Sequence, residues 1–266
     1  MLAPAGPGRP DRDGRAGGAG GAGGAGGAGR GDGLGGDGVA ARVDRLTDLR
    51  DGDVSAWLLA HLPNWSARAL VADCGTGVHT EQLAGRFNEV LAVDPDWPLV
   101  EHARRHRARG NVQYEVRSPQ EVTVGGDGRF DVVLGPDLRR YADPGAALAA
   151  LHHLRSLTRP EGIVLLVGRN RRDRPSAGMP RSGVRSAAWR ELRDDLRYAR
   201  RPVRDAVELL RLSLDRDLVA RQAAHGLWTR QDFDDLTGPV FPGASVTDLD
   251  RTRALAWRAP GPWART

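Results

Sequence analysis

The sequence contains a single cysteine, Cys74, and no lysine. One cysteine cannot form a disulfide within the chain, and it cannot provide the ligands of a cysteine-based zinc cluster. All 39 basic residues are arginines, and 34 acidic residues are mixed among them. The resulting formal charge of +5 is small for this length, so the composition gives little support for nucleic-acid binding.

Long apolar runs are also missing. No stretch approaches the ~20 apolar residues that a membrane-spanning helix needs. The first residues include no apolar core of the kind that signal peptides have. We therefore expect a cytoplasmic protein without a membrane partner.

Residues 1–38 have almost no large apolar side chains. They are dominated by Gly, Ala and Pro, and they include the run AGGAGGAGGAGG. A segment with so little to bury is predicted to be disordered. The run is short and has no proline in its triplets, which argues against a collagen helix. We expect the folded domain to span residues 39–266.

Apolar residues alternate between helical and strand patterns from there on. A helix is predicted over 53–62, where Val54, Trp57, Leu58 and Leu62 share one face ahead of Pro63. Short buried strands then alternate with helices, which predicts an α/β fold with a doubly wound, mostly parallel sheet. The predicted strands are 67–73, 89–94, 112–116, 129–134 and 162–168, and the predicted helices are 80–87, 97–108 and 144–157.

The alternation stops at residues 171–228. An arginine-rich loop and two predicted helices, about 186–200 and 203–224, form an insert that we expect to act as a lid over the substrate. A helix over 229–238 follows, with Thr229 as its N-cap. Two alternating segments, 244–250 and 254–260, predict a final antiparallel hairpin.

The stretch VADCGTGVHT places a glycine turn between the first strand of this sheet and the next helix. Such a turn gathers backbone N–H groups and the positive helix end at one point, which suits a nucleotide-like ligand. Thr80 stands where a dinucleotide fingerprint has its third glycine, so the pattern disfavours NAD. Asp94 closes the next strand, at the usual place for a carboxylate that binds both ribose hydroxyls.

Three segments carry a resemblance to a known family: CGTGVHTEQLA, VLAVDPDWPLVEHAR and RFDVVLGPDLRRYADPGAALAALHHLRSLTRPEGIVLL. Together they resemble the class I S-adenosylmethionine-dependent methyltransferases, in their small-molecule (type 11-like) branch. The resemblance implies a Rossmann-like sheet of seven strands that ends in an antiparallel hairpin. It also implies S-adenosylmethionine as cofactor and a small-molecule substrate. Separately, we expect no metal site.

The same resemblance assigns roles to individual residues. Asp94 is expected to hold the cofactor ribose, and Ser118 is expected to contact the adenine amino group. The other implied contacts are Gly75 and Gly77 with the methionine part, Pro95 and Asp96 with the sugar and adenine, and Gly135 with the transferred methyl group. Independently of the resemblance, His79 lies in the first turn after the glycines, where we expect it to touch the cofactor.

Three residues depart from the family pattern. Val71 stands at an acid position, and Asp73 and Glu161 stand at glycine positions. Residues two apart in a strand share a face, so Asp73 can replace the acid missing at Val71 and bind the cofactor. Alternatively, its carboxylate repels the carboxylate of the cofactor. The departures leave three functions open, namely a small-molecule methyltransferase, a catalytically decayed binding protein and an RNA methyltransferase.

Asp137 and Tyr141 follow the fourth strand and are the candidates for a catalytic base. The stretch GPDLRRY around them does not match the family's amine-methylating motif, so the acceptor atom stays undetermined. His152 and His153 lie inside a predicted helix, where packing or solvation is the simpler role. Cys74 is interpreted as a small buried side chain.

Overall fold

The computed structural model describes residues 33–63, 67–141, 143–169, 207–208, 210–212, 215, 229–249 and 252–261. The predicted tail up to residue 32 and most of the predicted lid lie outside these residues. Helix α1 (Gly33–Arg50) begins before residue 38, where we had placed the end of the tail. The helix buries Ala40 and Leu46, a packing signal that the glycine-rich composition of its first turns conceals.

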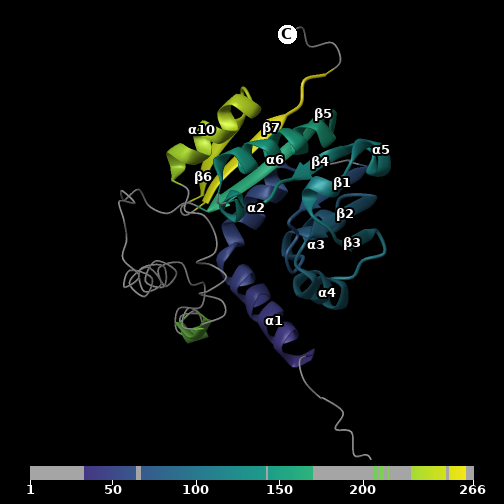
Figure 1. Ribbon diagram of the computed structural model, residues 1–266, viewed down its shortest axis with the longest axis vertical. Coiled ribbons are helices and arrows are strands. Elements are labelled where there is room, and N and C mark those ends of the chain that lie inside the picture. The colour runs from purple at the N-terminus through teal and green to yellow at the C-terminus, as the bar shows by residue number, and fades with distance from the viewer. Residues whose placement is uncertain are drawn as a thin grey trace, which may run out of the picture. The chain divides into compact units, whose positions relative to one another are not determined.

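One seven-stranded sheet forms the centre of the domain, in the order β3-β2-β1-β4-β5-β7-β6 (Figure 1). Strands β1 to β5 pair in parallel, and β7 is antiparallel to both β5 and β6. This confirms the predicted doubly wound sheet and its closing hairpin. The strands are β1 (Arg68–Ala72), β2 (Glu89–Asp94), β3 (Val112–Val116), β4 (Phe130–Leu134), β5 (Thr158–Arg169), β6 (Ser245–Leu249) and β7 (Thr252–Arg258).

Helices cover both faces of the sheet (Figure 1). One face packs against α2 (Gly52–His61), α3 (Val78–Ala84) and α4 (Trp97–His106). The other packs against α6 (Pro144–Leu157) and α10 (Arg230–Val240). All four apolar residues expected on the buried face of α2 are buried. The predicted cap of α10 is also confirmed, because the side chain of Thr229 accepts a hydrogen bond from the backbone N–H of Asp232.

Strand β5 begins earlier than we predicted, at Thr158. Thr158 pairs with Phe130 of β4, and the register shifts before the next pair, Val132 with Ile163. The stretch RPEG, which we expected to be a simple turn, therefore lies within an irregular part of the strand. Glu161 adopts a positive φ of 63° there, the conformation that explains the family's glycine at this position.

The strand order reverses between β1 and β4, the two central neighbours. The chain runs outward from β1 through β2 to β3 and then returns to the other side of β1 as β4. Ligands of open α/β sheets bind at such a switch point, beyond the carboxyl ends of the strands. The loops after β1 and β4 meet at this edge, together with the end of β2. Two short 3-10 helices and a one-turn helix complete the connections: η1 (Pro119–Glu121), α5 (Val124–Asp127) and η2 (Leu138–Arg140).

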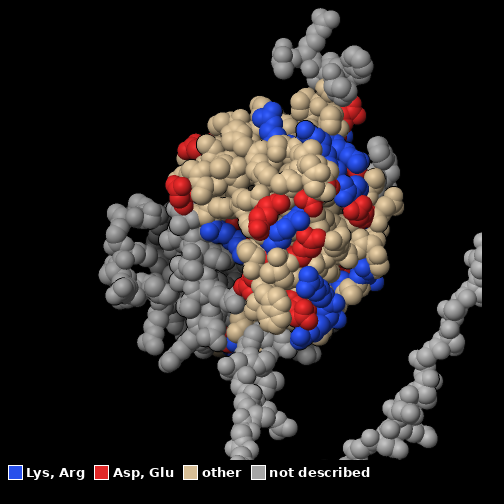
Figure 2. Space-filling view, turned by 45° about the vertical axis from the view of Figure 1, so that its right-hand side comes forward, with Lys and Arg blue, Asp and Glu red and all other residues tan. Residues whose placement is uncertain are grey.

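The described surface is charged but mixed. Basic and acidic side chains lie interspersed among uncharged ones on the face drawn in Figure 2. Within the described ranges, none of the helices combines the length and the apolar content needed to cross a bilayer.

Candidate functional site

The chain leaves β1 through three residues with left-handed backbone. Asp73, Gly75 and Gly77 have φ values of 58°, 55° and 83°. Glycine adopts this region freely, and aspartate is among the few other residues that tolerate it. The turn therefore keeps the backbone path that glycine would give, although Asp73 stands at its first left-handed position.

The two glycines serve different ends. A Cβ on Gly77 would lie 2.8 Å from Tyr114 Oη and 3.1 Å from Ala103 Cβ, so Gly77 lets α3 start close to β3 and α4. A Cβ on Gly75 would meet no atom within 4 Å. Gly75 thus faces open space at the carboxyl edge of the sheet, where a ligand can approach its backbone.

Asp94 ends β2 beside this turn and has no solvent exposure. Its Oδ2 atom accepts a hydrogen bond from the Gly75 N–H at 2.9 Å, and its Oδ1 atom accepts one from the Asp96 N–H at 2.8 Å. These two backbone donors fix the plane of the carboxylate. They tie the end of β2 to the glycine turn and to the start of α4.

Arg140, which the sequence analysis did not single out, completes the cluster. It lies at the end of η2, after β4, and its Nη1 atom is 2.8 Å from Asp73 Oδ1 and 3.1 Å from Asp94 Oδ2. One guanidinium thus bridges the two carboxylates. The signal available in the sequence was its position, since residues after β4 reach the same sheet edge as those after β1 and β2.

The site favours the neutral form of Asp73. Burial raises the pKa of its carboxyl to about 7, and the neighbouring Asp94 and Asp137 add to the rise. Arg140 opposes this shift, because its positive charge stabilises the ionised carboxylate. The effect of burial outweighs that of the ion pair, so Asp73 titrates near neutral pH.

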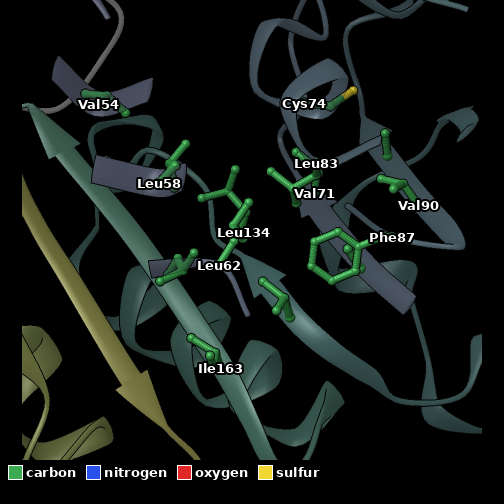
Figure 3. Packing of buried hydrophobic residues seen from close by; sticks show 14 of the residues in the cluster. Val54, Leu58, Leu62, Val71, Cys74, Leu83, Phe87, Val90, Leu134 and Ile163 are labelled. Carbon is green, nitrogen blue, oxygen red and sulfur yellow. The ribbon is translucent and has the colours of Figure 1, made fainter. Parts of the chain in front are cut away.

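The predicted replacement of the acid at Val71 by Asp73 loses its structural basis. Val71 is 2% exposed and packs with Leu83 and Leu134 in the cluster drawn in Figure 3. Strand β1 ends at Ala72, and the positive φ of Asp73 breaks the alternation of strand faces. Asp73 therefore does not share the face of Val71, and its carboxylate turns to Arg140 instead.

Several other predicted contacts are engaged within the protein. Ser118 belongs to the capping box of η1, where its N–H donates to Glu121 Oε2 at 2.7 Å and its hydroxyl contacts the Gln120 side chain. His79 Nε2 lies 3.3 Å from Asp51 Oδ2, between α1 and α2. Pro95, by contrast, is exposed at the end of β2.

Gly135 has a packing role that the sequence did not reveal. Its N–H donates to the Leu165 carbonyl oxygen at 2.8 Å, and a Cβ would collide with Leu166 Cδ2. The absence of a side chain at Gly135 thus leaves room for the buried side chain of Leu166. Whether Gly135 also borders a transferred methyl group stays a prediction.

The two candidate bases lie at the same edge as Arg140. The carbonyl oxygen of Asp137 accepts a hydrogen bond from the Arg140 N–H at 3.0 Å. Tyr141 Oη accepts one from Gln120 Nε2 at 3.1 Å, and burial raises the pKa of the phenol. Tyr141 is therefore protonated at neutral pH and suits hydrogen-bond donation better than proton abstraction.

The remaining reactive side chains show no organised site. His152 is exposed on α6, and His153 is partly buried there. Cys74 is buried in the cluster of Figure 3, and burial raises the pKa of its thiol, which disfavours the nucleophilic thiolate. In the part of the chain that the structure describes, no three His, Cys, Asp or Glu residues are grouped so as to hold a metal ion.

Known proteins resemble both the sequence and the fold. Residues 69–162 match the family described as a methyltransferase domain. The ubiquinone biosynthesis O-methyltransferase of Xanthomonas campestris pv. campestris (strain B100) is 33% identical over 108 residues, which are 40% of this chain and 44% of that protein. The protein of the same name from Cereibacter sphaeroides (strain ATCC 17025) is 29% identical over 133 residues, 49% of this chain and 52% of that protein. The chain thus spans about half the length of these curated relatives.

Solved structures extend the likeness over most of the chain. A DhpI–SAH complex superposes with a TM-score of 0.52 at 17% identity and covers 84% of this chain and 93% of that one. An O-methyltransferase family protein from Burkholderia thailandensis gives a TM-score of 0.55 at 14% identity and covers 84% and 60%. At these identities the likeness establishes the fold.

Proposed function

We propose that the chain is a class I S-adenosylmethionine-dependent methyltransferase that transfers a methyl group from S-adenosylmethionine to a small-molecule acceptor. The observation that carries the proposal is the carboxylate of Asp94. It closes β2 at the switch point of the sheet and is oriented by the N–H groups of Gly75 and Asp96. The two curated relatives described above are named as O-methyltransferases, which favours an oxygen atom as the acceptor.

The residues at this edge fit the cofactor. Asp94 would accept hydrogen bonds from the ribose hydroxyls, and the open space at Gly75 would admit the chain that extends from the sugar. Pro95 and Asp96 follow Asp94 directly and would flank the sugar and the base. The bound cofactor supplies an already activated methyl group, so the main tasks of the protein are to align the acceptor and to exclude water.

Asp137 and Tyr141 have different tasks in this proposal. Asp137 would accept the proton of an acceptor hydroxyl. Tyr141, whose raised pKa keeps it protonated, would orient the acceptor by donating a hydrogen bond. The position of both after β4, beside Arg140, supports these assignments.

Titration calorimetry with S-adenosylmethionine and S-adenosylhomocysteine tests the proposal. We expect Asp94→Asn to weaken both at least tenfold, because two hydrogen bonds to a charged acceptor are lost or weakened. Asp131→Asn is the matched control. Asp131 also accepts two backbone N–H bonds, from Ala67 and Arg68, and pairs with Arg159, but it lies where β4 begins, at the opposite edge of the sheet. Equal cofactor affinities in wild type, Asp94→Asn and Asp131→Asn would overturn the assignment of Asp94.

A non-catalytic binding protein is the second candidate. The contact between Arg140 and Asp94 favours it, since the guanidinium already occupies the carboxylate that the ribose needs. Failure of the wild type to bind cofactor at millimolar concentration would select this candidate. An RNA methyltransferase stays an untested alternative, and a cytoplasmic location stays a prediction from the sequence.

A further inference from the structure

We propose that Arg140 occupies the acceptor site of Asp94 that one ribose hydroxyl would use. When the ribose displaces the guanidinium from that site, Asp73 holds it. The inference rests on the proposed function, since it assumes that Asp94 is the ribose acceptor. It makes Arg140 a residue that sets cofactor affinity through an internal competition. It also gives Asp73 a purpose at a position where the backbone favours glycine.

The hydrogen bonds of Asp94 support the competition. A carboxylate offers about four acceptor sites, two on each oxygen. The Gly75 N–H and Arg140 Nη1 fill both sites on Oδ2, and the Asp96 N–H fills one site on Oδ1. Two adjacent hydroxyls that bind one to each oxygen therefore need the site that Arg140 takes on Oδ2.

Of these three donors, only Arg140 can leave without unfolding local structure. The N–H groups of Gly75 and Asp96 are fixed by the glycine turn and by the start of α4. The Arg140 donor is at the end of a long side chain that is 28% exposed, whereas Asp94 is fully buried. Of the three groups that contact Asp94 here, Arg140 is the only side chain. Movement of its guanidinium therefore exposes the carboxylate of Asp94.

Asp73 supplies the second anchor for Arg140. Its Oδ1 is 2.8 Å from Nη1, closer than Asp94 Oδ2 at 3.1 Å. A guanidinium released from Asp94 can therefore keep a carboxylate partner inside the site. Without Asp73, release would leave the cation with no described acid at this distance, and it would stay on Asp94.

Adenosine is the probe, because it carries the ribose and the base but no carboxylate that could pair with Arg140. The central variant is the double substitution Asp73→Asn with Arg140→Met, measured at pH 8. Asp73 is mostly ionised at that pH, so the variant removes one negative and one positive charge and leaves the net charge of the cluster nearly unchanged. We expect adenosine to bind this variant roughly tenfold more tightly than the wild type, since no charged donor competes for Asp94. We expect Asp73→Asn alone to bind it more weakly, because Arg140 then loses its alternative partner.

Calorimetry on the full chain separates the outcomes. Opposite changes in the single and double variants support the proposal, since a purely structural role of the ion pairs would weaken binding in both. Unchanged or weaker binding by the folded double variant overturns it, while wild-type binding that is lost in Asp94→Asn leaves the proposed function intact. If neither wild type nor double variant binds adenosine at millimolar concentration, the inference fails, while the proposed function is decided separately by the titration with S-adenosylmethionine. Asp73→Asn with Arg140→Gln replaces the double variant if the methionine form does not fold.

Discussion

Replacing Asp73 with asparagine should remove a pH dependence from the stability of the protein. The pKa of the buried carboxyl is raised from its ordinary 3.8 to about 7 in the folded state. The folded protein then holds a proton that the unfolded chain has released at the same pH. The contribution of Asp73 to stability is therefore full below pH 4 and is lost as the pH rises through 7.

The size of the effect follows from the two pKa values. One pKa unit corresponds to about 1.4 kcal/mol, so a shift from 3.8 to about 7 amounts to about 4 kcal/mol over the whole range. Between pH 5 and pH 8, where the protein is most easily measured, linkage gives a loss of roughly 2–3 kcal/mol. The free energy of unfolding of a domain is about 5–15 kcal/mol, so the change is a large fraction of the total stability.

Urea unfolding of wild type and Asp73→Asn at several pH values between 5 and 8 measures this loss. The seven histidines titrate in both proteins, so the difference between the two curves isolates Asp73. Asparagine has the same shape and also tolerates a positive φ, which cancels the backbone contribution. The free energy of unfolding of the variant, relative to that of the wild type, should rise by about 2–3 kcal/mol from pH 5 to pH 8. A difference that stays constant over this range would refute the argument that burial outweighs the ion pair with Arg140.

Two further predictions concern backbone and packing. Glu161→Gly should stabilise the protein by about 0.5–1 kcal/mol in thermal unfolding, because glycine removes the cost of a φ of 63°; Glu161→Ala, which keeps the Cβ, should give no such gain. Gly135→Ala should destabilise it by about 1–3 kcal/mol, because the new methyl group meets Leu166 and Leu154 Cδ1. Gly238→Ala, inside α10 with no atom within 4 Å of the added Cβ, is the matched control and should be neutral or slightly stabilising.

The fold could be predicted because its signals are local. Strands β2 and β3 and helix α6 have the predicted boundaries, and each is marked by a run of apolar residues between polar or turn residues. The parts that the sequence concealed depend on distant partners. The early start of β5 depends on pairing between Thr158 and Phe130. The first half of α1 has too few large apolar side chains for a helix to be predicted from its sequence pattern.

The same distinction between local and distant signals holds for the site. Asp94 was predictable because an acid at the end of the second strand is a pattern within a short stretch of sequence, and the structure places it beside Gly75. The departures at Asp73 and Glu161 were visible as well, and these are the two non-glycine residues with positive φ among those described. The missing glycines thus indicated where a non-glycine residue has an unfavourable backbone conformation. They did not indicate which interaction compensates for its free-energy cost.

For Asp73 the compensating interaction is an ion pair with an arginine that is distant in the sequence. Arg140 lies 46 residues beyond Asp94, which is itself in the next strand after Asp73, so no local spacing connects the three. The topology does connect them, because β2, β1 and β4 are adjacent and parallel, and the loops beyond their carboxyl ends converge. An unexpected acid after one central strand should therefore prompt a search for a cation after its neighbours. In this chain that cation is Arg140, which pairs with Asp73, so Asp73 is the partner of an arginine and not a substitute for the acid at Val71.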